Sequence, residues 1–433
     1  MQHYESYKPS GVKWIGNIPS HWEIKPGFTC FKENKNRNKG LIEKTVLSLS
    51  YGRIVVKPEE KLTGLVPETF ESYQLIEPGD VVIRTTDLQN DKTSLRVGLA
   101  KDKGMITSAY LGLRCNSSIN PTFIFRLLET YDALKIFYGM GSGLRQNIDF
   151  WDFKRLPILL PLRPEQDRIV SFLDQKTAEI DTAIAKKDRL IEMLQEQKNI
   201  LINQAITRGL NSAAQMRQSE AEWEEEVPSH WQRLRLKYCI DLLPGFAFKS
   251  SMYSTSETDI SLLRGVNINP GRLNWKEAVY WPKYKLSEFS DYLLAEGDLV
   301  IGMDRPWVSG GIRVAPVTKA DLPCLLLQRV ARLRAKGKIR QDFLELILTS
   351  QSFLSYFGPM LTGVSVPHIS PEQIGNFFVN LPPISEQEEI CTYVAKVKDL
   401  SSKAISYEVK SLASLAELKV ALVADVVTGK IKV

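Results

Sequence analysis

The four histidines are the first residues whose chemistry could reveal a catalytic or metal site. His21 and His230 each lie in a Pro-Ser-His-Trp segment. This segment occurs twice in the chain, and a tryptophan follows the histidine each time. Such a repeated histidine is typical of a packed, hydrogen-bonded structural side chain. His3 lies in a polar tail, and His368 has no His, Cys or carboxylate nearby at metal-ligand spacing. The sequence therefore predicts neither a metal site nor a catalytic histidine.

The motifs of nucleotide-dependent and methyl-transferring enzymes are also missing from the sequence. Gly139, Gly141 and Gly143 follow a predicted helix, whereas Gly-x-Gly-x-x-Gly requires a preceding strand. Residues 120–123, NPTF, only approach the Asn/Asp-Pro-Pro-Tyr/Phe loop of an amino-methyltransferase. The five cysteines are scattered and odd in number, which favours a reducing cytoplasm, and no apolar run is long enough to span a membrane. We therefore predict a cytoplasmic, non-catalytic chain without a cofactor of its own.

Positive charge is concentrated in two blocks of the chain. Residues 1–162 hold 22 Lys and Arg against 17 Asp and Glu, and residues 227–383 hold 18 against 13, so each block carries +5. Segments 163–208 and 384–433 are neutral, with 8 against 8 and 7 against 7. A basic excess favours a polyanionic partner, and we interpret the two blocks as nucleic-acid-binding modules.

Two long helices are predicted to position these blocks. Residues 165–207 contain no Gly or Pro, and their apolar side chains recur with a heptad period. Such a helix is roughly 65 Å long and needs a partner, which residues 386–428 supply as a second copy without a gap. We expect an antiparallel pair, with Lys187 and Lys198 either at its edge or facing a partner subunit. The predicted coiled-coil interface consists of Leu173, Ile180, Ile184, Ile191, Leu194, Leu201, Val394, Ile405, Leu412, Leu415 and Leu422.

The globular blocks are repeated as well. Pro-Ser-His-Trp occurs at residues 19–22 and 228–231, and the Gly-Asp segment at 79–80 recurs at 297–298. Short strands, among them residues 325–334, alternate with turns and a few helices, which predicts a mixed α/β fold. The expected architecture is two globular domains separated by two long antiparallel coiled-coil helices, an internal pseudo-two-fold duplication. The domains are expected at residues 1–160 and 227–381, the helices at 161–209 and 382–433, and an acidic, solvated linker at 210–226.

Both helix entries carry a related motif. Residues 160–166, LPLRPEQ, precede Ile169, and residues 381–387, LPPISEQ, precede Ile390. In order with the Pro-Ser-His-Trp and Gly-Asp segments, these entries resemble the specificity subunits of type I restriction–modification systems over essentially the whole chain. The resemblance implies two target-recognition domains, each reading one half of a bipartite, asymmetric DNA sequence in the major groove.

The resemblance also implies partners. Two methyltransferase subunits would dock on the spacer helices, and restriction subunits with motor and nuclease activities would complete the complex. S-adenosylmethionine, ATP and magnesium would belong to those partners.

Polar and basic residues in the predicted turns are the candidates for contact with double-stranded DNA. Arg and Lys can bond guanine, and Asn and Gln can bond adenine. Loops 141–147 and 362–368 are the strongest candidates, because they occupy the same place in the repeat and differ in side chains. The predicted DNA-binding residues are Arg53, Arg84, Lys92, Arg145, Gln146 and Asn147 in the first copy, and Arg264, Asn267, Arg305, Ser365 and His368 in the second.

Two other hypotheses remain open from the sequence. One is a coiled-coil scaffold that binds proteins and has no DNA specificity, which the +5 charge of each block mildly disfavours. The other is a nuclease or methyltransferase that acts alone, which the missing motifs disfavour.

Overall fold

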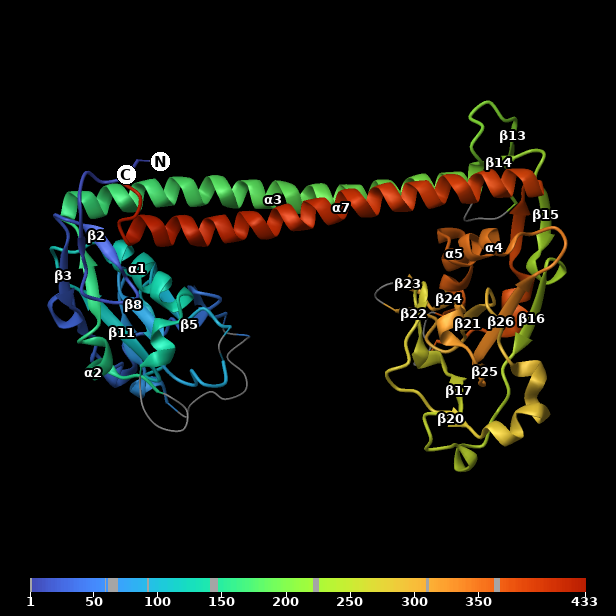
Figure 1. Ribbon diagram of the computed structural model, residues 1–433, viewed down its shortest axis with the longest axis horizontal. Helices are drawn as coiled ribbons and strands as arrows, with labels where there is room; N and C mark the ends of the chain where they lie inside the picture. The colour runs from blue at the N-terminus through green and yellow to red at the C-terminus, as the bar shows by residue number, and fades with distance from the viewer. Residues whose placement is uncertain are drawn as a thin grey trace. The chain divides into compact units, whose positions relative to one another are not determined.

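The computed structural model describes residues 2–58, 60, 69–91, 93–140, 147–220, 226–308, 311–361 and 367–433. The chain divides into two compact units: unit 1 is Met1–Arg189 with Glu408–Val433, and unit 2 is Leu190–Tyr407. Two long helices, α3 (Arg163–Arg208) and α7 (Ile384–Val427), contribute residues to both units (Figure 1). The mixed α/β fold with two globular parts and two long helices is therefore confirmed.

Unit 1 is built on a four-stranded antiparallel sheet in the order β4-β11-β8-β9. Its strands are β4 (Phe31–Glu33), β11 (Tyr110–Cys115), β8 (Val81–Arg84) and β9 (Val97–Leu99). The Val-Val-Ile run of β8 is β-branched and fully buried, which is typical of a central strand. Two-stranded pairs surround this sheet: β1 (Tyr7–Pro9) with β2 (Asn17–Pro19), β3 (Glu23–Pro26) with β12 (Pro157–Leu160), β5 (Leu47–Ser50) with β6 (Arg53–Val56), and β7 (Gln74–Ile76) with β10 (Gly104–Ile106).

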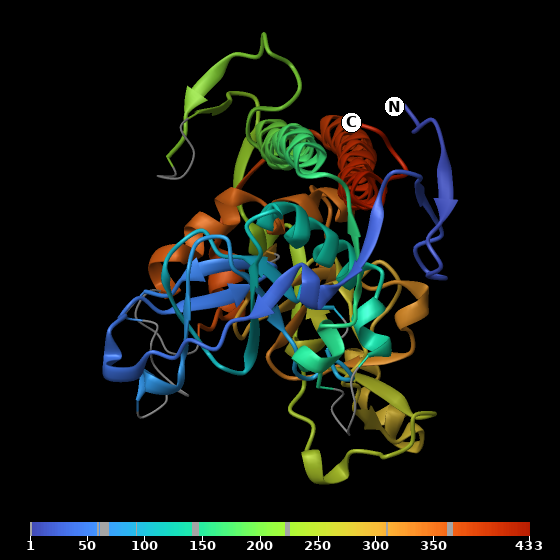
Figure 2. The same ribbon diagram turned by 90° about the vertical axis from the view of Figure 1, so that its left-hand side faces the viewer.

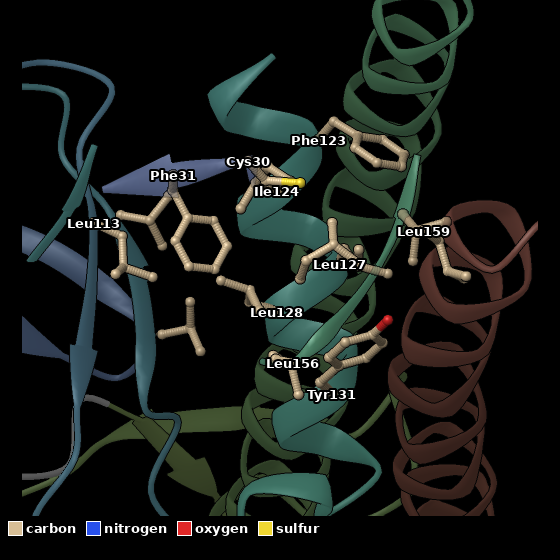
Figure 3. Close-up of a cluster of buried hydrophobic side chains, with 14 of the residues drawn as sticks. Cys30, Phe31, Leu113, Phe123, Ile124, Leu127, Leu128, Tyr131, Leu156 and Leu159 are labelled. Carbon is tan, nitrogen blue, oxygen red and sulfur yellow. The ribbon is translucent and has the colours of Figure 1, made fainter. Parts of the chain in front are cut away.

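Helix α1 (Pro121–Ala133) packs against this sheet, and the short α2 (Phe150–Phe153) follows it in the chain. Asn120 caps the N-terminus of α1 with its side-chain oxygen, and Pro121 stands in the first turn, where a missing N–H costs nothing. Leu128 points from α1 toward Phe31, whereas Leu127 points toward Leu159, and all four side chains belong to the core of unit 1 (Figure 3). The apolar face of α1 is thus fully used in packing.

Unit 2 repeats this arrangement. Its four-stranded antiparallel sheet has the order β16-β26-β21-β24, formed by β16 (Ile240–Pro244), β26 (Val330–Ala335), β21 (Leu299–Gly302) and β24 (Val314–Pro316). A three-stranded sheet joins β20 (Tyr280–Trp281), β17 (Ile260–Leu263) and β25 (Cys324–Leu326). The two-stranded pairs are β13 (Met216–Gln218) with β14 (Glu226–Pro228), β15 (Gln232–Arg235) with β27 (Phe378–Leu381), β18 (Ile268–Asn269) with β19 (Arg272–Leu273), and β22 (Trp307–Val308) with β23 (Gly311–Ile312). Its helices are α4 (Gln341–Leu348), α5 (Gln351–Leu361) and α6 (Pro371–Asn376).

Within each unit the segments of α3 and α7 lie side by side and run antiparallel (Figures 1 and 2). In unit 1, Leu173 and Leu422 share one core, and Lys419 Nζ lies 2.6 Å from Asp181 Oδ1. In unit 2, Ala205 and Ile390 share the other core. The predicted interface residues are all buried or partly buried: Leu173, Val394 and Leu422 are buried, and Ile180, Ile184, Ile191, Leu194, Leu201, Ile405, Leu412 and Leu415 are partly buried.

Lys187, a charged residue within the predicted apolar stripe of α3, has an ion-pair partner. Lys187 Nζ lies 2.6 Å from Glu408 Oε2, and the two side chains are 28% and 14% exposed. The aliphatic stem of Lys187 can therefore lie in the seam while its charge is neutralised at the edge. Of the described helices, none is long and apolar enough to cross a membrane.

Two local predictions differ from the structure. Residues 325–334 do not form one strand, because the chain turns at Gln328 and Arg329 between β25 and β26. The Leu-Leu-Leu run before this turn and the Val-Ala-Arg run after it are both apolar enough for strands. The composition of the sequence therefore gives no sign of the turn between them. Residues 216–218 of the expected linker form β13, which pairs with β14.

Candidate nucleic-acid interface

Each long helix begins with a carboxylate that ties it to the start of a globular unit. In unit 1, Glu165 accepts hydrogen bonds from Tyr4 Oη at 2.8 Å and from Trp22 Nε1 at 3.1 Å. His21 Nε2 lies 2.9 Å from the other carboxylate oxygen and must donate, because a carboxylate only accepts. Burial, and then the hydrogen bond to Glu165, raise the pKa of Tyr4 above its usual range. A negative charge in the first turn of a helix is also favoured by the helix dipole.

Unit 2 has the same contact. Glu386 accepts from Trp231 Nε1 at 3.1 Å and from His230 Nε2 at 2.9 Å. The hydrogen-bonded, structural role predicted for His21 and His230 agrees with these contacts. The Pro-Ser-His-Trp segment is thus a docking point for the helix.

The glutamine after each glutamate joins the helix to a second loop. Gln166 Nε2 donates to Pro161 O at 2.9 Å, and its Oε1 accepts from Asn120 N at 2.9 Å. Gln387 repeats this, donating to Pro382 O and accepting from the backbone N–H of Arg340, again at 2.9 Å. We call Glu165-Gln166 and Glu386-Gln387 the helix-entry joints. They fix where each helix leaves its unit.

The repeated Gly-Asp segments hold a second structural pair, at the start of the central strand. Asp80 precedes β8 and accepts two hydrogen bonds from the guanidinium of Arg114, with Nη2 2.6 Å from Oδ2. Asp298 precedes β21 and binds Arg334 in the same bidentate way, with Nη2 2.8 Å from Oδ2. Both carboxylates are almost fully buried. We call this the framework end of each sheet, and the opposite end, beyond Arg84 in β8 and Gly302 in β21, the far end.

The far end of unit 2 brings together two predicted residues and two that were not predicted. Arg305 N donates to Pro367 O at 2.7 Å, and Asp304 forms a β-bridge with His368. His368 Nδ1 lies 2.7 Å from Asp304 Oδ1, and Arg329 Nη1 lies 2.5 Å from Asp304 Oδ2. Burial alone would raise the pKa of Asp304, but the hydrogen bonds from Arg329 and His368 lower it below its usual value. One carboxylate therefore organises two exposed cationic or polar side chains.

The far end of unit 1 has the same backbone and different side chains. Ile148 N donates to Thr85 O at 3.0 Å, as Ile369 N donates to Met303 O at 2.9 Å in unit 2. Asn147 Oδ1 accepts from the backbone N–H of Asp87 at 3.3 Å. Asn147 and His368 therefore occupy equivalent places.

The predicted residue Arg84 is held within unit 1. Its Nη1 lies 3.1 Å from Asp91 Oδ2. Hydrogen bonds from Ser94, together with the charge of Arg84, hold the pKa of Asp91 well below its usual range. The side chain of Arg84 remains 32% exposed.

Arg96 holds the loop beyond β8 from inside. Its side chain is completely buried, and its Nε donates to Tyr138 Oη at 3.1 Å. Its terminal nitrogens donate to the carbonyl oxygens of Arg84, Thr86, Asp87 and Asp91. A buried charge is tolerated only when its donors are satisfied, and here backbone carbonyls satisfy them.

The remaining predicted residues are distributed as follows. Arg53 is exposed at the start of β6, next to the turn of the β5–β6 hairpin. Arg264 donates to the carbonyl oxygen of Glu277, and Asn267 is 1% exposed with its amide bonded to Asn274 O at 3.0 Å, so Asn267 stabilises its own loop. Lys92, Arg145, Gln146 and Ser365 lie outside the described residues, with most of loops 141–147 and 362–368. In the described ranges, no group of three or more His, Cys, Asp or Glu side chains is placed to hold a metal ion.

With this geometry in hand, the chain can be compared with known proteins. Residues 246–411 match the family described as "Type I restriction modification DNA specificity domain". Residues 246–411 are therefore similar to the DNA specificity domain of type I restriction–modification systems. The match covers most of unit 2 and more than half of α7.

Relatives of this family resemble different extents of the chain. The EcoAI specificity subunit of Escherichia coli is 36% identical over 194 residues, which are 45% of this chain and 32% of that subunit. The MjaVIII specificity subunit of Methanocaldococcus jannaschii is 26% identical over 333 residues, 76% of this chain and 75% of that subunit. The chain thus spans about a third of the first relative and three quarters of the second.

Solved structures share the fold of this chain. One, from work on complex assembly and conformational transition of the type I R-M system, has a TM-score of 0.69 at 16% identity and covers 96% of this chain and 99% of its own. The HsdS subunit from Thermoanaerobacter tengcongensis has a TM-score of 0.57 at 17% identity, covering 96% and 98%. These likenesses support the duplicated α/β fold with long helices.

Sequence reasoning missed three residues of the far ends. Asp304 and Arg329 were overlooked because a lone carboxylate and an arginine inside an expected strand carry no motif. Arg96 lies in a Leu-Arg-Val segment, residues 95–97, which recurs as Ile-Arg-Val with Arg313 at residues 312–314. Nothing in the sequence says that the charge of Arg96 is buried. The Asp304-Arg305-Pro306 turn directly after a buried strand was the one signal available.

Proposed function

We propose that this chain is the sequence-reading subunit of a type I restriction–modification complex, in which each unit reads one half of a bipartite, asymmetric DNA target. The observation that carries the proposal is the far end of the two sheets. The backbone hydrogen bond from Ile148 to Thr85 in unit 1 recurs from Ile369 to Met303 in unit 2. The side chains around it differ: Asn147 and Arg84 in unit 1, Arg305 and His368 in unit 2. A shared scaffold with different polar groups suits two different half-sites.

The charge and the family support the same proposal. Each globular block carries +5, which phosphate contacts require. The domain match over residues 246–411 and the similarity to type I specificity subunits favour DNA recognition over the alternative of a protein-binding scaffold. We further propose that the chain is not itself an enzyme. Two methyltransferase subunits and the restriction subunits would supply catalysis with S-adenosylmethionine, ATP and magnesium, in the cytoplasm where the DNA is.

The test is methylation-sensitive sequencing of DNA from cells that express this chain with its methyltransferase subunits. We expect methylation at one split sequence. Exchanging residues 227–383 for another such domain should change one half of that sequence and leave the other half intact. Equal binding to target and scrambled DNA at physiological salt would favour the scaffold hypothesis.

A second experiment addresses catalysis. The purified chain alone, incubated with DNA, magnesium and labelled S-adenosylmethionine, should neither methylate nor cleave. Either activity without partners would revive the hypothesis of a stand-alone enzyme.

A further inference from the structure

The far end of unit 2 carries an arginine whose role the fold does not explain. Arg329 lies in the turn between β25 and β26, and its side chain is 65% exposed. Two other arginines of this sheet have structural partners: Arg334 binds the buried Asp298 at the framework end, and the buried Arg332 binds Asp241 of β16. Arg329 is therefore available for a ligand.

Two residues at this site adopt backbone conformations that side chains disfavour. Arg329 has φ +65° and Arg305 has φ +44°, both in the left-handed region. Hydrogen bonds hold both: Met303 N donates to Arg329 O at 2.9 Å, and Arg305 N donates to Pro367 O at 2.7 Å. Strain of this kind collects at functional sites, where it aims side chains in a fixed direction.

Asp304 fixes the guanidinium of Arg329. One carboxylate oxygen lies 2.5 Å from Arg329 Nη1, and the other accepts from His368 Nδ1 at 2.7 Å. The carboxylate is only 24% exposed, so Asp304 itself is held firmly. The preorganised guanidinium loses less freedom on binding than a free arginine would.

The same contact selects the kind of ligand. Asp304 compensates the charge of Arg329 and would repel a phosphate brought beside it. The N–H donors of the guanidinium that Asp304 does not use are held in a fixed orientation. Because the charge is compensated, these donors suit neutral hydrogen-bond acceptors. Guanine presents two such acceptors, N7 and O6, on its major-groove edge, at the spacing of a guanidinium.

Unit 1 offers no equivalent. Strand pairing aligns Leu333 with Leu299 in unit 2 and Leu113 with Val81 in unit 1. The residue that precedes β11 is therefore the counterpart of Arg329, and it is Ala109. The arginine belongs to one half of the duplication only.

We infer that Arg329 is a specificity-determining residue that reads a guanine in the half-site of unit 2, with Asp304 as its positioning residue. This inference rests on the proposed function. It names a base and a residue that the repeat and the family match do not supply.

The test selects sequences from a random DNA duplex pool with the full chain and its methyltransferase subunits. In Arg329→Ala and Arg329→Lys, the preference for guanine at one position of one half-site should fall roughly 5- to 150-fold, the usual range for a bidentate base contact. The other half-site should be unchanged. Arg329→Lys should not restore the preference for guanine, because lysine keeps the positive charge but lacks the planar pair of N–H donors.

Asp304→Asn tests the positioning role. It keeps an acceptor but removes the charge, so the preference for the same guanine should fall less than in Arg329→Ala. Arg340→Ala is the matched control, because Arg340 also binds an aspartate, Asp342, with Nη2 2.9 Å from Oδ2, but lies beyond the opposite end of β26. It should leave the selected sequence unchanged.

Several results would overturn the inference. If Arg329→Ala weakened binding to all sequences alike and Arg329→Lys restored it, Arg329 would be a phosphate contact. Unchanged selection in both variants would make it a bystander. If the wild-type chain selected no sequence at all, the proposed function itself would fail, so the two failures are distinguishable.

Discussion

The far ends of the two sheets are built from equivalent strands and share two backbone hydrogen bonds, from Arg84 to Arg96 and from Ile148 to Thr85 in unit 1, yet their charges are used in opposite ways. In unit 1 the loop beyond β8 closes over Arg96, whose guanidinium is buried among carbonyl oxygens. In unit 2 the equivalent Arg313 is partly exposed and donates only a long bond, 3.4 Å, to Gly265 O, while Arg329 faces solvent. The duplication thus preserves the scaffold and leaves each far end free to place its arginines inside or outside.

Substituting the two equivalent arginines, Arg96 and Arg313, should give the largest difference in stability between the two units. Arg96→Ala should lower the free energy of unfolding of unit 1 by about 3–5 kcal/mol, because it leaves a cavity and several unpaired carbonyls. Arg313→Ala should cost unit 2 about 1 kcal/mol, since its side chain is partly solvated. Hydrogen–deuterium exchange in urea, followed on peptides of each unit, measures both. Equal losses would show that the far ends are not built differently.

The helix-entry joints should differ less. Glu165→Ala removes the acceptor of three donors and should cost unit 1 about 2–4 kcal/mol. Glu386→Ala removes the acceptor of two donors, with its carboxylate 21% exposed, and should cost unit 2 about 1–2 kcal/mol. The same exchange experiment reads both, with Glu388→Ala, an exposed residue of α7, as the control. If Glu386→Ala lowered the free energy of unfolding more than Glu165→Ala, the number of donors to each carboxylate would not explain the stability of the joints.

Two aspartates should give the smallest effects, with opposite signs. Burial raises the pKa of Asp132 above its ordinary value of 3.8, although the backbone N–H of Arg96 counteracts this. The folded state therefore binds a proton more readily than the unfolded state, and the charged form destabilises unit 1 above the folded pKa. Asp132→Asn should stabilise unit 1 at pH 7, and the gain should disappear as the pH falls below 3.8.

Asp304 shows the reverse dependence. Its pKa is lowered below 3.8 by Arg329 and His368 despite burial, so its contribution is present above 3.8 and is lost as the pH falls through the folded value. Asp304→Asn should cost unit 2 about 1 kcal/mol at pH 7, the typical net size of one hydrogen bond. Urea denaturation across pH 3–7 checks both signs. If Asp132→Asn and Asp304→Asn changed the free energy of unfolding in the same direction at pH 7, the opposite pKa shifts assigned to the two aspartates would be wrong.

The sequence was sufficient for the parts of the fold that depend on local pattern. The heptad period and the absence of Gly and Pro predicted both long helices, and the repeated Glu-Gln motif marked where they begin. Those signals are local or repeated at a constant offset, so they can be read without a structure.

The far ends could not be predicted in the same way. Asp304 and His368 are 64 residues apart, and only the closing of the sheet brings them together. The turn at Arg329 is hidden between two apolar runs, and the burial of Arg96 depends on carbonyls that any residue types would provide. Of the predicted DNA-binding residues, Arg305 and His368 meet at one site, whereas Asn267 is buried in its own loop.

The placement of two aspartates at opposite ends of β21 has an evolutionary consequence. Asp298 secures the sheet at one end and Asp304 organises exposed side chains at the other, separated by a strand of about 13 Å. Substitutions at that distance usually act additively on stability. The exposed side chains can therefore be replaced over generations without eroding the fold, and a new recognition preference can arise with little compensating change elsewhere.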